Sequence, residues 1–250
     1  MSSTLDATGG LLVIADLHLD LSQARGADEF VAWCDALRPV RHLVVLGDLV
    51  DAWVGPAHAQ LPAAQQLLSA FTRLGARGTR VHLVHGNRDF LLDEAFGAQH
   101  NLLVHPEQLV VQCGANRVLL VHGDLECTRD HGYQRLRRVV RSRPVRGLAR
   151  VLPLWIALPV ARRLRRASVQ AIAAKLPEDK SIQPAAIASR AQVHAAQVVV
   201  CGHAHAFRDE LLTTAAPTGQ PAETVRWIVL DAWGGARAVL WLDEHGVAVA

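Results

Sequence analysis

The sequence has no apolar run long enough to cross a membrane. Its longest candidate, residues 151–161, covers eleven positions and contains two prolines, whereas a spanning helix needs roughly 18 continuous apolar residues. The first ten residues are small and polar, without the basic and apolar regions of a secretory signal, so no signal peptide is expected. Both absences favour a protein that stays in the cytoplasm.

Cysteine is also scarce. The four cysteines, Cys34, Cys113, Cys127 and Cys201, are scattered and form no C-x-x-C pair. This spacing argues against a structural zinc site and against a disulfide framework. It fits the reducing environment of the cytosol.

Acidic residues are nearly missing from one segment. Residues 126–183 hold 14 Lys and Arg against 4 Asp and Glu, a net charge of +10, whereas the remainder of the chain carries 12 basic and 19 acidic residues, a net of −7. Between Tyr133 and Arg166 there are eleven arginines and no acid. This asymmetry indicates a polyanionic partner for that segment alone.

The order of apolar runs predicts an α/β protein. A chain of 250 residues, half of them hydrophobic and without an internal repeat, suits a single domain over 1–250 with an insertion. Strands over 11–14, 43–46 and 81–84 alternate with helices over 27–37 and 62–74, which favours a parallel sheet with right-handed crossovers. A hairpin is expected over 109–120, a helix over 185–195 and a strand over 198–201. The runs 225–230, 238–242 and 247–249 are expected to close a second sheet.

Five of these apolar strands end in polar side chains that can bind metal ions. Carboxylate, imidazole and carboxamide groups together suit Mn²⁺, Fe²⁺ or Zn²⁺. Seven such side chains are too many for one ion with an open position, so two ions bridged by one carboxylate are expected. A single histidine at a strand end is more often structural than a ligand, but five such ends in succession favour a metal site. The candidates are Asp16, His18, Asp48, Asn87, His122, His203 and His205.

The motifs D-x-H, G-D-x-x-D, G-N-x-D, H-G-D and G-H-x-H, in this order, resemble the calcineurin-like metallophosphoesterase superfamily. The resemblance implies a β-sandwich core flanked by helices, with a two-metal centre at its rim. By matching position, it implies that Asp48 bridges the two ions. The first ion would then be held by Asp16, His18, Asp48 and His205, and the second by Asp48, Asn87, His122 and His203.

Arg88 stands where many members of this superfamily carry a histidine. Arginine is too basic to act as a general acid, but it can bind two phosphate oxygens at once. Such a residue stabilises charge on a transferring phosphoryl group and protonates a leaving group poorly. Arg88 therefore favours a pyrophosphate linkage, whose leaving group departs without protonation, with Asn87 and Arg88 holding the phosphoryl group.

The arginine-rich segment surrounds a short apolar run, residues 152–158. A solvated helical face packed on the core is the plain interpretation. RNA binding would need more aromatic rings than Tyr133 and Trp155 for base stacking, so no nucleic acid partner is expected. Arginines beside an apolar face fit anionic lipid headgroups together with acyl chains.

Nearly the whole chain is similar to the UDP-2,3-diacylglucosamine pyrophosphatases of lipid A biosynthesis, through residues 47–53, 85–92, 122–134, 152–168 and 232–233. The resemblance implies a basic and apolar helical lid inserted at 126–183 that covers the acyl chains over a Mn²⁺ pair. It implies a substrate that is a UDP-linked acylated glucosamine lipid. The implied substrate contacts are Asn87, Arg88, Asp130, Tyr133, Arg165, Ser168, Lys175 and His203.

The resemblance also implies a reaction. A water activated by two metal ions attacks the α-phosphorus of UDP-2,3-diacylglucosamine and gives UMP and 2,3-diacylglucosamine 1-phosphate (lipid X). The enzyme would work at the anionic cytoplasmic face of the inner membrane, peripherally associated and without an obligate protein partner. Two alternatives stay open: a soluble nucleotide pyrophosphatase or phosphodiesterase on the same core, and a non-catalytic module that binds anions through its arginines.

Overall fold

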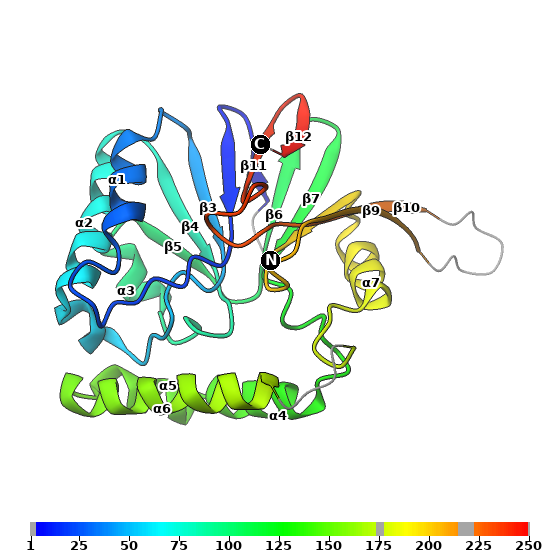
Figure 1. Ribbon diagram of the computed structural model, residues 1–250. Coiled ribbons are helices and arrows are strands. Elements are labelled where there is room, and N and C mark those ends of the chain that lie inside the picture. The colour runs from blue at the N-terminus through cyan, green and yellow to red at the C-terminus, as the bar shows by residue number, and fades with distance from the viewer. Residues whose placement is uncertain (1–3, 174–177, 215–222, 250) are drawn as a thin grey trace.

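The computed structural model describes residues 4–173, 178–214 and 223–249. Two six-stranded sheets pack face to face, and helices cover their outer faces (Figure 1). This arrangement confirms the expected α/β fold with a sandwich of two sheets. We call the sheet that contains the N-terminal parallel strands sheet I and the other one sheet II.

Sheet I has the strand order β12-β11-β2-β3-β4-β5. Strands β2, β3, β4 and β5 are parallel to one another, and β5 is at the edge of the sheet. Strand β11 pairs antiparallel with β2, and β12 pairs antiparallel with β11. Its strands are β2 (Leu11–Ile14), β3 (His42–Leu46), β4 (Arg80–Val84), β5 (Leu102–His105), β11 (Val239–Asp243) and β12 (Gly246–Val249).

Sheet II has the strand order β1-β6-β7-β8-β10-β9. The hairpin of β6 and β7 is antiparallel, as predicted, and β8 is parallel to both β7 and β10. Its strands are β1 (Leu5–Asp6), β6 (Gln108–Cys113), β7 (Asn116–Val121), β8 (Val198–Cys201), β9 (Arg208–Thr213) and β10 (Thr224–Val229).

Strand β3 illustrates why the central strands are apolar at every position. Leu43 and Val45 pack into the cluster between sheet I and its helices, whereas Val44 and Leu46 pack between the two sheets. Successive side chains point to opposite faces, and both faces of this strand are buried. A continuous apolar run is the sequence pattern that such a strand requires.

Two groups of helices cover the outer faces of the sandwich. Sheet I is covered by α1 (Asp28–Ala36), α2 (Pro62–Ala76) and α3 (Glu94–Ala98), with the 3₁₀ helix η1 (Pro56–Gln60), and sheet II by α7 (Pro184–His194). Leu67, Phe71 and Leu74 on α2 are buried against sheet I, as their helical spacing predicts.

The arginine-rich stretch forms three helices that run across one end of the sandwich (Figure 1). We call α4 (His131–Val140), α5 (Arg143–Val151) and α6 (Leu154–Ala173) the α4–α6 segment. Ala149, Ala157 and Ala161 of this segment are buried in the same cluster as Trp53 and Val54. Within the described ranges, no helix is long and apolar enough to cross a membrane.

The structure differs from the sequence prediction in the pairing of the C-terminal strands. Only the run around β10 joins sheet II, and the prediction that β11 and β12 do so is wrong, since Trp241 pairs with Leu12 in sheet I. Alternating apolar residues identify a strand but not its neighbour, because both sheets offer the same pleated surface. The sequence also does not predict strands β1, β5 and β9. In β9 nearly every residue is exposed, so its sequence lacks an apolar face.

Candidate metal centre

The seven candidate ligands lie at the carboxyl ends of five strands that belong to both sheets. Asp16 and His18 follow β2, Asp48 follows β3 and Asn87 follows β4 in sheet I. In sheet II, His122 follows β7, and His203 and His205 follow β8. Since these strands are parallel within each sheet, their ends meet at one rim of the sandwich.

The backbone at these positions is strained. Among the described residues, the non-glycine residues with positive φ include Asp16, His18, Asp48, His203 and His205, with φ between 49° and 66°. Residues other than glycine rarely adopt this conformation, which persists only where the surrounding structure imposes it. Five of the seven candidates are therefore held in an unfavourable backbone shape that turns their side chains to the same place.

Three glycines allow the ligand-bearing turns to approach one another closely. A Cβ atom on Gly47 would lie 2.5 Å from Nδ1 of His122, and one on Gly202 would lie 2.5 Å from Oδ2 of Asp16. A Cβ atom on Gly86 would collide with the backbone nitrogen and side chain of Asp48. Any side chain at these positions would push the candidate ligands apart.

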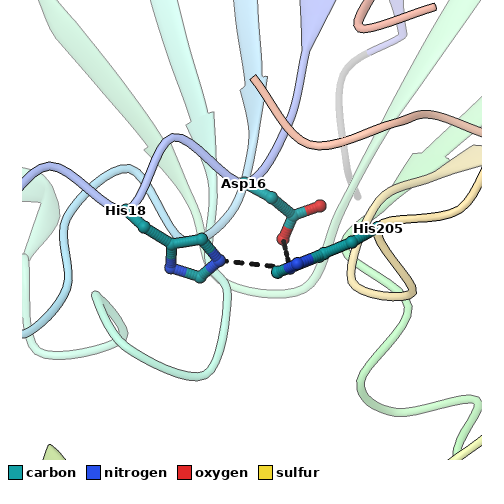
Figure 2. Close-up of side chains that lie close together, drawn as sticks. All are labelled: Asp16, His18 and His205. Carbon is teal, nitrogen blue, oxygen red and sulfur yellow. Dashed lines mark hydrogen bonds and ion pairs between the residues drawn. The ribbon is translucent and has the colours of Figure 1, made fainter. Parts of the chain in front are cut away.

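One cluster consists of Asp16, His18 and His205, whose side chains point toward one another in Figure 2. Nε2 of His205 lies 3.4 Å from Oδ1 of Asp16 and 3.1 Å from Nε2 of His18. Asp16 is buried, and its other oxygen accepts a hydrogen bond of 2.7 Å from the backbone nitrogen of His203. This bond orients the carboxylate and leaves Oδ1 facing the two imidazoles.

A second, overlapping cluster consists of Asp16, Asp48 and His122. Nδ1 of His122 donates to the carbonyl oxygen of Leu46 at 2.8 Å, which leaves its Nε2 atom on the side of the cluster. That Nε2 atom lies 3.1 Å from Oδ1 of Asn87, 3.2 Å from Nδ1 of His203 and 3.8 Å from Oδ1 of Asp48. The structure thus brings all seven candidates into two adjoining groups, with Asp16 common to the two carboxylate–histidine clusters.

Burial and crowding of charge shift the pKa values of these groups. Burial, together with the nearby carboxylates of Asp89 and Asp16, raises the pKa of Asp48 to about 7. Burial lowers the pKa of His18 and of His203 to about 4 each. Both imidazoles are therefore neutral at pH 7 and have a lone pair to share, as metal ligation requires. The nearby carboxylates of Asp48 and Asp16 instead raise the pKa of His122 to about 9, so this imidazole has to release a proton when it binds a metal ion.

The arrangement fits divalent metal ions. Oδ1 of Asp16 and Nδ1 of His18 are buried without a hydrogen-bond partner among the described residues. Buried polar atoms normally have a partner, and the protein offers these two only long contacts, 3.4 Å from Oδ1 of Asp16 to Nε2 of His205 and 3.8 Å from Nδ1 of His18 to Oδ2 of Asp48. The donor set of carboxylate, imidazole and carboxamide groups, without thiolate, suits Mn²⁺, Fe²⁺ or Zn²⁺. These observations agree with the sequence interpretation of the rim as a metal site.

Arg88 lies beside the metal site and contacts two carboxylates. Its Nε atom is 3.3 Å from Oδ2 of Asp48, and its backbone nitrogen donates to Oδ1 of the same residue at 3.0 Å. Its Nη1 atom is 3.9 Å from Oδ1 of Asp51. Only a small part of the Arg88 side chain is exposed to solvent, so its guanidinium group is held beside the candidate ligand Asp48.

The α4–α6 segment carries other residues predicted to contact substrate, and the structure places them differently. Arg165 on α6 reaches the rim, with Nη2 2.8 Å from Oδ2 of Asp51. Asp130 caps α4 by accepting a hydrogen bond of 3.0 Å from the backbone nitrogen of Tyr133, whose hydroxyl group donates to Asp124. Ser168 is half-buried on α6. Lys175 lies outside the described residues.

Three further carboxylates of the motifs, for which the sequence predicts no role, also have partners in the structure. Asp89 is fully buried and accepts hydrogen bonds from the backbone nitrogens of Gly86 at 2.8 Å and Leu49 at 2.9 Å, so it fastens two ligand loops together. Asp124 receives the Tyr133 hydroxyl, and Asp51 receives Arg165. Each of these carboxylates is the last residue of its motif, G-N-x-D, H-G-D or G-D-x-x-D, and this position is the sequence feature that could have pointed to a role.

Comparison with known proteins agrees with this geometry. The calcineurin-like phosphoesterase model matches residues 10–207. A UDP-2,3-diacylglucosamine hydrolase of Pseudomonas putida is 34% identical over 241 residues, which cover 96% of this chain and 98% of that protein. One of Pseudomonas entomophila is 35% identical over 244 residues, with the same coverage.

Among solved structures, vacuolar protein sorting 29 of Cryptosporidium parvum aligns with 96% of this chain and 95% of its own, at 13% identity and a TM-score of 0.44. The match to the calcineurin-like phosphoesterase family and the matches to the two hydrolases include both the five ligand-bearing strand ends and the α4–α6 segment. The chain belongs to the calcineurin-like phosphoesterase family.

Proposed function

We propose that this protein hydrolyses the pyrophosphate bond of UDP-2,3-diacylglucosamine, giving UMP and 2,3-diacylglucosamine 1-phosphate, a step of lipid A biosynthesis. The observation that carries this proposal is the match to curated UDP-2,3-diacylglucosamine hydrolases over 96% of the chain. Because the match includes the α4–α6 segment as well as the metal-site rim, it covers the parts that would distinguish one substrate from another.

The metal site would hold two divalent ions, with Mn²⁺ as our first choice. Asp16, His18, Asp48 and His205 would hold one ion, and Asp48, Asn87, His122 and His203 the other. When bound, such a pair supplies Lewis acidity toward water and toward the oxygens of the pyrophosphate. The proximity of two strongly buried carboxylates, Asp16 and Asp48, supports a cationic occupant.

The protein's own contribution to the chemistry comes from Asn87 and Arg88. The guanidinium of Arg88 would bind oxygens of the phosphoryl group that is attacked, replacing the carboxylates that it faces in the ligand-free protein. A guanidinium group is a poor general acid, so Arg88 would stabilise charge without protonating the leaving group. The leaving sugar phosphate needs no proton, which makes a pyrophosphate the substrate that suits this residue.

The α4–α6 segment would act as a lid over the acyl chains, and Arg165, Ser168, Tyr133, Asp130 and Lys175 would contact the sugar phosphate. Large apolar side chains are exposed on this segment, with 75% of Val151 and of Trp155 accessible to solvent. Eight of the eleven arginines of residues 133–166 are exposed on the same segment, namely Arg135, Arg138, Arg143, Arg150, Arg162, Arg163, Arg165 and Arg166. An apolar surface flanked by arginines supports binding to lipid and to an anionic membrane surface. The other exposed apolar residues are Leu136, Val139, Leu148 and Leu164.

We propose that the protein works in the cytoplasm, peripherally associated with the inner membrane through this surface. Vesicles of a zwitterionic lipid, with and without an anionic lipid, would test this in a sedimentation assay. Binding that requires the anionic lipid and weakens with salt would support the proposal. Equal recovery in the pellet with and without vesicles would refute it.

Hydrolysis of UDP-2,3-diacylglucosamine with Mn²⁺ in ¹⁸O-labelled water tests the reaction and its direction together. The proposal predicts UMP that carries the label and a sugar 1-phosphate that does not, because water attacks the α-phosphorus. Label in the sugar phosphate would mean attack at the β-phosphorus. Absence of both products would refute the activity, whereas faster hydrolysis of soluble nucleotide diphosphosugars would favour a soluble pyrophosphatase.

A further inference from the structure

Helix α4 contacts the loop after β7, which carries His122. Asp124, two residues after His122, is buried and accepts hydrogen bonds from the hydroxyl group of Tyr133 and from Nε of Arg137, the latter at 3.2 Å. Nε2 of Gln134 also donates to the carbonyl oxygen of Asp124 at 2.9 Å. Three side chains of α4 thus surround one residue of the His122 loop.

The end of the same helix contacts the loop after β4, which carries Asn87 and Arg88. Arg141 caps the carboxyl end of α4, and its Nη2 atom donates to the carbonyl oxygen of Gly86 at 3.0 Å. Its Nη1 atom donates to the carbonyl oxygen of Pro106 at 2.8 Å, and its guanidinium lies over the ring of Phe90, 5.6 Å from the centre. Arg141 is thereby held on three sides.

The carbonyl group of Gly86 belongs to the peptide that links Gly86 to Asn87. A hydrogen bond to this oxygen restrains the orientation of that planar peptide and with it the position of the Asn87 Cα atom. The Gly86 Cα also lies against Asp48, where no Cβ atom fits, so this peptide has little room to rotate without disturbing the neighbouring ligand.

We propose that α4 positions one of the two metal ions by joining the two loops that provide Asn87 and His122. The facing ligand atoms of these residues, Oδ1 and Nε2, are 3.1 Å apart, yet they come from different sheets. Arg141, at the end of α4, binds the loop that carries Asn87. Tyr133 and Arg137 of the same helix bind Asp124 in the loop that carries His122. Arg141 and Tyr133 are positioning residues, since neither touches the ion.

The inference rests on the metal-ligand assignment proposed above and is independent of the lipid substrate. Outer-shell partners of metal ligands typically contribute about 10- to 100-fold to metal affinity. We therefore expect Arg141→Met, which keeps the bulk of the chain but removes both hydrogen bonds, to weaken one Mn²⁺ binding step by about that factor. The other step should be unchanged, and Arg141→Lys should recover part of the loss.

The experiment is Mn²⁺ titration of the metal-free protein by calorimetry, with Asn87→Ala used to identify the affected step. Arg143→Met is the matched control, because Arg143 lies on the same segment and is exposed. Tyr133→Phe is a milder second variant that should weaken the same step from the other end of α4. Hydrogen exchange of the metal-free protein should show faster exchange at residues 85–92 in Arg141→Met.

Three results would overturn the proposal. Two binding steps of unaltered affinity in Arg141→Met would show that α4 does not position the ion. Equal weakening of both steps, together with a lower melting temperature, would show a purely structural role. If the unaltered protein binds no Mn²⁺ at all, the metal-ligand assignment fails, and the role of α4 fails with it.

Discussion

Arg165 on α6 lies 2.8 Å from the carboxylate of Asp51, three residues after the candidate bridging ligand Asp48. The same carboxylate lies 3.9 Å from Arg88, so Asp51 stands between an arginine of the core and an arginine of the α4–α6 segment. A substrate phosphate would have to compete with Asp51 for both guanidinium groups. Asp51 thus connects the α4–α6 segment with the metal-site rim.

The Arg165–Asp51 pair should contribute little to stability. The Arg165 side chain is 47% exposed, and ion pairs of this kind are worth about 0–1 kcal/mol. Burial raises the pKa of Asp51, which offsets part of the attraction. We expect Asp51→Asn to change the free energy of unfolding by less than about 1 kcal/mol in urea titrations. A loss of several kcal/mol would show that the pair anchors the segment.

Replacement of Asp48 should be the most damaging change among the metal ligands. A bridging carboxylate contributes to both ions, so Asp48→Ala should lose metal content and turnover together. Metal analysis of the purified protein and activity with added Mn²⁺ are the measurements. Two bound ions and near-normal turnover in Asp48→Ala would refute the bridging role.

Arg88 should act through its bidentate geometry and its charge. Arg88→Lys keeps the charge but loses the paired hydrogen bonds, so kcat should fall, and Arg88→Ala should lose more. Arg88→His should give no better enzyme for the pyrophosphate substrate, although it could gain activity on aryl monoesters. Steady-state kinetics with Mn²⁺ measure these effects, and unchanged turnover in Arg88→Ala would contradict the role.

Two buried histidines and a partly buried neighbour should make the fold sensitive to acid. His42, His82 and His105 lie on the adjacent strands β3, β4 and β5, with ring nitrogens 3.0 Å apart at each contact. Burial, with help from the charges of its neighbours, lowers the pKa of His82 from 6.5 to about 3 and that of His42 to about 4. The folded protein therefore accepts these protons later than the unfolded chain as pH falls.

Because the unfolded chain binds these protons at a higher pH than the folded protein does, the free energy of unfolding decreases as pH falls from 6.5 toward 3. Each group lowers it by up to about 1.4 kcal/mol per pH unit, and above pH 6.5 this loss is absent. His82→Gln removes one such group, so its free energy of unfolding should depend less steeply on pH between 6.5 and 5. Urea unfolding at a series of pH values measures this slope. An identical slope in the two proteins would exclude His82 as a source of the dependence.

Much of the metal-site rim could be predicted from the sequence because each ligand follows directly on an apolar strand. The glycine before Asp48, the glycine before Asn87 and the glycine before His203 mark sharp turns, and turns of this kind act within a few residues. Parallel strands place their carboxyl ends at one edge, so the convergence of Asp16, Asp48 and Asn87 follows from local patterns.

Contacts between the α4–α6 segment and the core could not be predicted in the same way. Arg141 is one of eleven arginines between residues 133 and 166, and nothing in the local pattern separates it from the exposed Arg143. Its partners are backbone carbonyl groups of Gly86 and Pro106, which leave no trace in residue type. Strand β11 likewise pairs with β2, which contains Leu12 and is far away in the sequence, and the alternating apolar residues of β11 do not identify this partner.

We propose above that this protein acts on an acylated substrate. The most direct test compares kcat/KM for UDP-2,3-diacylglucosamine with kcat/KM for UDP-glucosamine that has no acyl chains, both measured with Mn²⁺. Each buried methylene group contributes about 0.8 kcal/mol, so a preference of orders of magnitude is predicted. Replacing the exposed Leu148 and Trp155 by serine should reduce this preference while two metal ions stay bound. Equal kcat/KM values for the two substrates in the unaltered protein would contradict the claim.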